Sequence, residues 1–162
     1  MLATATESPA VLASDWLARF AAALADEAAL RQLFDVESHW RDVLALTWRI
    51  RTVSSRDALV PELSRCAAAA RAARFELDPT RTPPRQVTRA GTACIEAIFR
   101  FQTSVGRGSG VLRLLAGDQP KAWTFLTALD EIRGHEEMVG RRRPSGQLYS
   151  RDFAGPNWLE QR

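Results

Sequence analysis

The sequence predicts an α+β fold in which helices come first and a meander of antiparallel strands comes last. Two observations predict this order. In the first half of the chain, apolar residues recur at helical spacing. From residue 92 to residue 132 they instead alternate with other side chains at the strand period of two. Because helices and strands do not alternate along the chain, a parallel βαβ arrangement is not expected.

Two helices are predicted near the N-terminus. An apolar stripe at steps of four indicates the first: Leu12, Trp16, Phe20 and Leu24. Ser8 with Pro9, or else Ser14, would cap its start. Leu30, Leu33 and Phe34 continue with helical spacing. Apolar residues at i, i+3 and i+4 then predict a second, short helix: Trp40, Val43 and Leu44.

The period changes in the stretch TWRIRTV, where Trp48 and Ile50 alternate with arginines. This pattern predicts a strand with one buried face. Ser54 and Ser55 then indicate the cap of a long helix over residues 56–74, whose alanine-rich side is typical of close packing against a sheet. Pro61 should kink or delay its first turns. The prolines and threonines of ELDPTRTPPRQ predict a loop after it.

Three strands are predicted in the second half: TACIEAIFRFQTS, GVLRLLA and KAWTFLTALDEI. Alternation places one set of side chains of the first strand on a single face: Ile95, Ala97, Phe99 and Phe101. In the third strand the corresponding set is Trp123, Phe125, Thr127 and Leu129. These two sets are expected to form the inner layer of the sheet.

A glycine cluster, VGRGSG, separates the first two of these strands. A dinucleotide-binding loop must open a helix, because the helix N-terminus binds the pyrophosphate. Here a strand follows Gly110. We therefore expect a hairpin whose glycines supply positive φ angles and whose tip displays Arg107. No flavin- or nicotinamide-binding loop is predicted.

Composition narrows the class of protein further. The 162 residues are enough for one domain. No apolar run reaches the length of a membrane span and no signal peptide is recognisable, so a cytoplasmic protein is expected. The arginines are scattered except for Arg141 to Arg143, which argues against nucleic-acid binding. Two cysteines and two histidines argue against a disulfide framework and against a metal site.

Several stretches resemble a known group of domains: HWRDVLALTWRIRTVSSRDAL, FRFQTSVGRGSGVLRLL, KAWTFLTALDEIRGHEE, GRRRPSG and GPNWLEQR. The resemblance is to the N-terminal domain that precedes the flavin-binding region in bacterial and fungal flavin-containing monooxygenase-like proteins. That domain belongs to the nuclear-transport-factor-2-like superfamily, whose other members include SnoaL-like cyclases and ketosteroid isomerases. The resemblance extends from Trp16 to Arg162.

This resemblance implies a cone, in which a curved antiparallel sheet wraps around the N-terminal and central helices and leaves an apolar pocket. It implies a domain over residues 14–140, after a flexible N-terminus (1–13) and before a basic, proline-containing tail or linker (141–162). In the fused proteins NWLE leads into a flavin-binding strand, which here would lie beyond Arg162. FAD and NADPH would therefore belong to a fused or partner flavoprotein, on which the arginine run 141–143 would dock.

Aromatic side chains on the predicted buried faces are candidates for lining the pocket: Trp40, Trp48, Phe99, Phe101, Trp123 and Phe125. The alternative is that they only fill the core, and in a cone the two roles partly merge.

Four residues are candidates for catalysis: His39, Asp42, Asp130 and His135. Isomerase chemistry of the ketosteroid type needs a carboxylate base and acidic donors that hold an oxyanion. The single tyrosine, Tyr149, lies in the tail. For His135, which is followed by Glu136 and Glu137, a structural or solvent-exposed role is the expected alternative.

Two functions remain open at this point. The first is a non-catalytic accessory domain that binds an apolar small molecule, assists a flavoprotein, or forms a homodimer through the outer face of its sheet. The alternative is a stand-alone, cofactor-free enzyme of the SnoaL type (an isomerase, cyclase or hydrolase) that acts on an apolar substrate. The two differ in whether a carboxylate or imidazole faces an apolar cavity.

Overall fold

The computed structural model describes residues 7–117, 119–143, 155–156 and 159–160. It contains three α-helices: α1 (Pro9–Ala23), α2 (Glu27–Leu33) and α3 (Arg56–Ala70). Seven strands form one sheet: β1 (Phe34–Val43), β2 (Ile50–Ser54), β3 (Ala73–Leu77), β4 (Arg85–Arg89), β5 (Thr92–Gln102), β6 (Gly106–Leu115) and β7 (Lys121–Ile132). A short 3-10 helix, η1 (Gly140–Arg142), follows β7.

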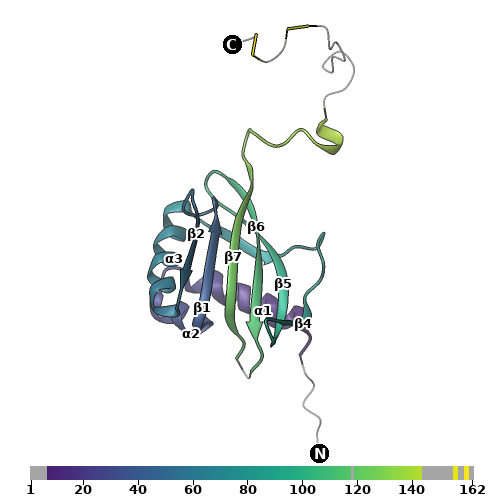
Figure 1. The fold of residues 1–162 in the computed structure, drawn as a ribbon. Coiled ribbons are helices and arrows are strands. Elements are labelled where there is room, and N and C mark those ends of the chain that lie inside the picture. The colour runs from purple at the N-terminus through teal and green to yellow at the C-terminus, as the bar shows by residue number, and fades with distance from the viewer. Residues whose placement is uncertain (1–6, 118, 144–154, 157–158, 161–162) are drawn as a thin grey trace, which may run out of the picture.

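The sheet has the order β2-β1-β7-β6-β5-β3, and β4 pairs with another part of β5. All pairs are antiparallel except β1 with β7, which is parallel. Figure 1 shows the sheet in front of α1, with α3 beside the β2–β1 side. This arrangement confirms the predicted α+β class, a curved sheet around helices. None of the helices in the described ranges is long and apolar enough to span a membrane.

Helix α1 begins at Pro9, and the hydroxyl of Ser8 accepts a hydrogen bond from the amide of Val11 (3.3 Å). Residues 9–13, expected to belong to a flexible N-terminus, are thus part of this helix. Its predicted stripe packs on the sheet, where Trp16 and Phe20 are completely buried. Residues 1–6 of the expected flexible segment, and residues 144–154 of the expected tail with Tyr149, lie outside the described residues.

The second, short helix predicted from Trp40, Val43 and Leu44 is wrong. This stretch lies in or directly after strand β1. Buried and more exposed residues alternate there: Trp40 and Asp42 are buried, and His39 and Arg41 are more exposed. The polar side chain of Asp42 occupies an inward position, so the apolar residues of this stretch do not alternate at the strand period of two. Their remaining spacing is the i, i+3, i+4 spacing of a helix.

The buried face predicted for TWRIRTV is also wrong. Strand β2 begins only at Ile50, and Trp48 and Ile50 are 55% and 62% exposed. The physical reason is position: β2 is an edge strand that pairs only with β1, so nothing covers its outward side chains. Strands β3 and β4 also take up both ends of the stretch predicted as a loop.

Helix α3 confirms the predicted central helix, although it ends at Ala70 and not at residue 74. Ser55 is its N-cap, and Pro61 lies within a continuous helix. The buried side includes Leu59, Leu63 and Ala67, which face the sheet. The helical spacing of apolar residues over several turns therefore predicted this helix correctly, and only its C-terminal end was placed too late in the sequence.

The glycine cluster is not the tip of a hairpin. Gly106, Gly108 and Gly110 lie within strand β6 on its buried face, and none of the three has a positive φ. A Cβ added to Gly110 would come within 2.1 Å of the carbonyl oxygen of Leu126 and 2.3 Å of Cζ of Phe99. A Cβ added to Gly108 would come within 2.6 Å of Cζ of Phe101. The missing side chains thus make room for two rings of β5.

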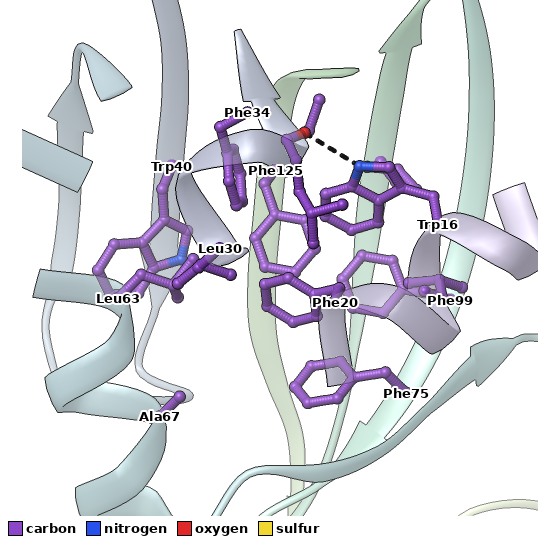
Figure 2. Close-up of a cluster of buried hydrophobic side chains, with 14 of the residues drawn as sticks. Trp16, Phe20, Leu30, Phe34, Trp40, Leu63, Ala67, Phe75, Phe99 and Phe125 are labelled. Atoms are coloured by element: carbon purple, nitrogen blue, oxygen red, sulfur yellow. Dashed lines mark hydrogen bonds between the residues drawn. The ribbon is translucent and has the colours of Figure 1, made fainter. Parts of the chain in front are cut away.

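The core is a cluster of stacked and tilted aromatic rings on the inner face of the sheet, as Figure 2 shows. Phe99 stacks on Phe125 with ring centroids 5.1 Å apart, and Phe75 stacks on Phe101 at 5.2 Å. The burial predicted for Phe99, Phe101 and Phe125 is confirmed. Trp123 is only half-buried, because a β-bulge shifts the register there and Ala122 takes the inward position.

We predict that Gly110→Ala lowers the free energy of unfolding by about 3 kcal/mol or more, because the new methyl group overlaps backbone and a fully packed ring. Urea unfolding followed by circular dichroism measures this. Gly117→Ala is the matched control, since an added Cβ meets no atom within 4 Å there. Equal stability of the two variants would contradict the proposed packing of Phe99 over β6.

Candidate functional site

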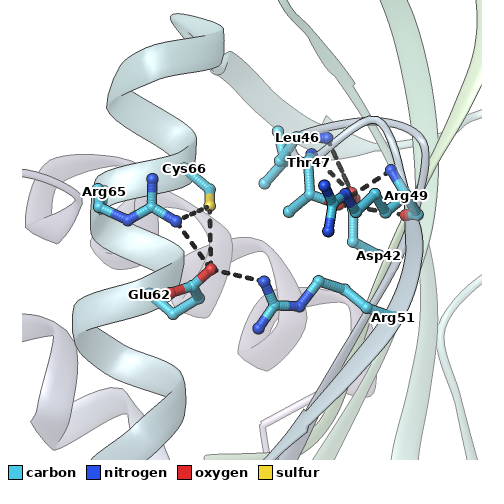
Figure 3. Close-up of polar contacts among 8 residues, drawn as sticks. All are labelled: Asp42, Leu46, Thr47, Arg49, Arg51, Glu62, Arg65 and Cys66. Atoms are coloured by element: carbon cyan, nitrogen blue, oxygen red, sulfur yellow. Dashed lines mark hydrogen bonds and ion pairs between the residues drawn. The ribbon is translucent and has the colours of Figure 1, made fainter.

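Asp42 is the sequence candidate with the most extensive polar contacts. Its carboxylate is completely buried at the end of β1. Oδ2 accepts hydrogen bonds from the amide and the hydroxyl of Thr47 at 2.8 and 2.7 Å, and from the amide of Leu46 at 3.1 Å. Oδ1 accepts from the hydroxyl of Thr127 at 2.7 Å. Figure 3 shows the loop folded over this carboxylate.

The hydroxyl of Thr127 extends this network across the sheet. It accepts a hydrogen bond from Nε1 of Trp40 (3.0 Å) while it donates to Asp42. All three side chains are completely buried. A carboxylate that is enclosed and already accepts from the surrounding donors has the features of a structural anchor, and it presents no atom to a substrate.

The other three candidates lie apart from Asp42. Nδ1 of His39 is 2.9 Å from the hydroxyl of Ser54 on the neighbouring strand, and Asp130 accepts a 2.9 Å hydrogen bond from Ser109. His135 follows β7, and its side chain is exposed. In the described ranges no hydrogen bond joins any two of the four candidates. Nor does any group of three or more His, Cys, Asp and Glu side chains there have an arrangement that could hold a metal ion.

The candidate pocket-lining residues divide into two groups. Trp40, Phe99 and Phe125 have no exposed surface, and Phe101 has 1%, so these rings fill the space inside the sheet. Trp48 is exposed instead, and the half-buried Trp123 is displaced from the inner face by the bulge. Four of the six candidates therefore contribute to the core, and Trp48 and Trp123 do not.

A polar groove of about 990 Å³ crosses the ends of β3, β5, β6 and β7. Its walls carry the ion pairs Glu76–Arg100 (2.9 Å) and Arg107–Glu131 (2.7 Å). Arg142, from the arginine run expected to dock on a flavoprotein, pairs with Glu131 at 2.6 Å within its own chain. Sequence reasoning did not find this groove, because its charges come from separate strands that only the sheet register brings together.

The outer face of the sheet carries an apolar row across three strands. Ile98, Val111 and Leu126 are direct partners in the register of β5, β6 and β7. Each is half-buried although the helices lie on the opposite face. The row is a partly exposed strip of aliphatic surface at the middle of the sheet.

An ionic cluster borders this row. Glu96 accepts from Arg89 (2.7 and 3.0 Å) and Arg113 (2.9 Å), and Arg85 lies 3.5 Å away. The hydrogen bonds from Arg89, and further those from Arg113, lower the pKa of Glu96 from its ordinary value of 4.5 to about 2 against the opposing effect of burial. One carboxylate thus joins three strands on the outer face.

Comparisons with known proteins identify the fold. A domain of unknown function with a cystatin-like fold from Nostoc punctiforme is 10% identical, with 80% of this chain and 82% of that chain covered and a TM-score of 0.55. A second cystatin-like protein of unknown function from the same organism is 10% identical over 80% of this chain and 96% of that chain, with a TM-score of 0.52.

The designed chain "Rd1NTF2_04 with long sheet" is also 10% identical over 70% of this chain and 97% of that one, with a TM-score of 0.50. The fold is therefore nuclear-transport-factor-2-like, and identities this low show the fold alone. No protein-family model and no curated protein matches the sequence.

We predict that Asp42→Asn lowers the free energy of unfolding by about 2–4 kcal/mol, because an amide group would face backbone donors with a donor of its own. Urea unfolding measures the change. Asp130→Asn is the control: the hydrogen bond that Asp130 accepts from Ser109 is exposed, so a change within about 0.5 kcal/mol is expected. An Asp42→Asn variant as stable as the control would show that the carboxylate does not anchor the loop.

We predict that Glu96 makes stability depend on pH in the acid range. Its pKa is lower in the folded chain, so its contribution is fully present above about pH 4.5 and is lost as the pH falls toward 2. At neutral pH the wild type should exceed Glu96→Gln by about 2–3 kcal/mol, and the difference should shrink on acidification. Unfolding at several pH values tests this. Glu76→Gln, in a more exposed pair, is the control and should lower the free energy of unfolding at neutral pH by about 1 kcal/mol or less.

Proposed function

We propose that this chain is a non-catalytic accessory domain of the nuclear-transport-factor-2-like fold that forms a homodimer through the outer face of its sheet. The apolar row of Ile98, Val111 and Leu126 is the observation that carries this proposal. Three aliphatic residues aligned across the central strands and bordered by ion pairs have the character of an interface with an apolar centre and a polar rim.

A two-fold axis through this row would bring the same residues of two copies together, as a self-complementary interface requires. The row lies on the middle strands β5, β6 and β7, so a partner sheet could cover it without displacing a helix. The ionic cluster around Glu96 on one side would then form part of the rim.

The non-catalytic part of the proposal rests on the contacts of the candidate residues. Asp42 is enclosed by hydrogen-bond donors, and His39 and Asp130 each contact a serine of a neighbouring strand. The inner aromatic rings are buried. These observations support the accessory-domain hypothesis more than the enzyme alternative.

Association with a flavoprotein monooxygenase is a further part of the proposal. It rests on the resemblance of segments such as KAWTFLTALDEIRGHEE to the domain that precedes a flavin-binding region. In that setting the cofactors FAD and NADPH would be bound by the flavoprotein module, in the same chain or in a partner, and this domain would hold two such modules together.

We predict that the wild-type chain is dimeric and that Val111→Glu makes it monomeric, because a buried, unpaired carboxylate at the centre of the interface is costly. Sedimentation velocity measures the mass, and circular dichroism checks the fold. Val11→Glu is the matched control: Val11 is 46% exposed on α1, away from the outer face. A monomeric wild type, or a dimer unaffected by Val111→Glu, would contradict the proposed interface.

A further inference from the structure

The loop between β1 and β2 displays large apolar side chains at the surface. Leu44, Trp48 and Ile50 are 41%, 55% and 62% exposed. Arg41 on β1 and Arg49 in the loop are exposed as well. We refer to these five residues as the loop surface.

The loop is held rigidly even though it is exposed. Asp42 accepts hydrogen bonds from the amides of Leu46 and Thr47, and the amide of Leu44 donates to the carbonyl of Arg49 (3.2 Å). Ala45 and Leu46 are buried in the core beneath it. Figure 3 shows how the chain folds over the carboxylate. Such a loop can present a side chain in one position, so that little freedom is lost on binding.

Two backbone positions in this loop are strained. Leu44 has a φ of 64° and Trp48 a φ of 57°, a region that bulky residues rarely adopt. Strain of this kind persists only where the surroundings enforce it, and it is common at binding sites. The buried carboxylate of Asp42 provides that enforcement. Glycine would adopt both conformations more easily, so folding alone gives no reason for a tryptophan at position 48.

The charge of the loop surface is unbalanced. In the described part of the chain, neither Arg41 nor Arg49 forms an ion pair, and Arg41 contacts only the hydroxyl of Thr52 (3.2 Å). By contrast, Arg51 on the inner side pairs with Glu62 at 2.8 Å. The nearby carboxylate of Asp42 is buried and bonded to its own loop. Two exposed arginines without an ion-pair partner in the described residues, Arg41 on β1 and Arg49 next to Trp48 in the loop, therefore belong to the same hairpin as the exposed tryptophan.

We propose that the loop surface is a docking site for a segment of a partner protein in which carboxylates flank an apolar anchor. Tryptophan and arginine are the residue types that most often carry the binding energy of protein interfaces. The apolar anchor would pack on Trp48 and Leu44, and the carboxylates would bind Arg41 and Arg49 bidentately. A membrane surface fits less well, because anionic lipids are bound by larger clusters of basic residues.

Within the loop surface, Arg41 adjoins the proposed dimer interface, because it is the register partner of Leu126. Trp48 and Arg49 lie in the β1–β2 loop, whereas the apolar row lies on β5, β6 and β7, so variants at these two positions test the site separately from the dimer. The experiment is selection of a random peptide display library on the full-length wild-type chain, with counter-selection on Trp48→Ala. We expect the enriched peptides to combine an aromatic or aliphatic residue with two or more Asp or Glu. A synthetic copy of one such peptide serves as the probe for measuring Kd by fluorescence anisotropy.

We expect Trp48→Ala and Arg49→Glu each to weaken binding of this peptide about tenfold or more. Each acidic residue of the peptide is replaced singly by Lys. At the position that pairs with Arg49, this replacement should restore binding to Arg49→Glu and weaken binding to the wild type. Met138→Ala, which removes another exposed apolar side chain, and Val111→Glu should bind as the wild type does. Trp48→Gly should abolish binding yet raise the thermal midpoint, because glycine relieves the strained φ.

Four results would overturn the proposal. Peptides that bind wild type and Trp48→Ala equally would place the contact elsewhere. Self-association that is lost in Trp48→Ala would make the loop surface an interface between copies of this chain. Binding to phosphatidylserine vesicles that depends on Trp48, with no peptide selected, would make it a membrane contact. A lower thermal midpoint for Trp48→Gly would show that Trp48 is retained for folding.

Discussion

The packing of the sheet depends on the side chains that strand β6 lacks. Gly108 and Gly110 leave the inner face of this strand bare, so that the rings of Phe101 and Phe99 lie across it. Phe99 can then stack on Phe125 from the far side of β6, with ring centroids 5.1 Å apart. Helix α1 closes the cluster from the other side through Trp16 and Phe20. Large rings on β5 and glycines on the neighbouring β6 together give the dense packing that protein interiors require. The inner face of the sheet is therefore a packed core.

A second constraint acts at the other end of the sheet, where a charged group is buried. Taking the carboxylate of Asp42 out of water is costly unless donors replace the water, and Leu46, Thr47 and Thr127 supply them. Two of these residues lie in the β1–β2 loop, so the same bonds that satisfy the charge also determine the path of the loop. That path includes the positive φ angles at Leu44 and Trp48. The buried polar network and the exposed tryptophan are therefore two parts of one arrangement, and a change in the first should be felt at the second.

These two constraints also explain how far the sequence could be interpreted. Strand β5 was predicted correctly because Phe99 and Phe101 stand at the strand period between polar or less buried neighbours. Strand β1 was missed because Ser38 and Asp42 occupy inward positions, and a pattern that scores them as polar loses its period. The glycines were assigned to a turn because local sequence does not show that rings from another strand cross them. Of the candidate site residues, Asp42 was found by residue type. Its role as an anchor depends on the folding of the next loop over it and on one donor, Thr127, that lies 85 residues away, and no local pattern shows either.

The distribution of polar and apolar groups differs between the interior of this domain and its surface. Inside the sheet the aromatic rings contact one another, and the buried polar atoms of Trp40, Asp42 and Thr127 are satisfied by partners in the same chain. The outside differs: aliphatic side chains form an aligned row on the middle strands. The exposed Trp48 is followed by Arg49, which has no ion-pair partner in the described residues. Unsatisfied groups are where a partner can contribute free energy. Their concentration on the outer face and on the β1–β2 loop is the basis of our proposal that this domain binds partners through its surface.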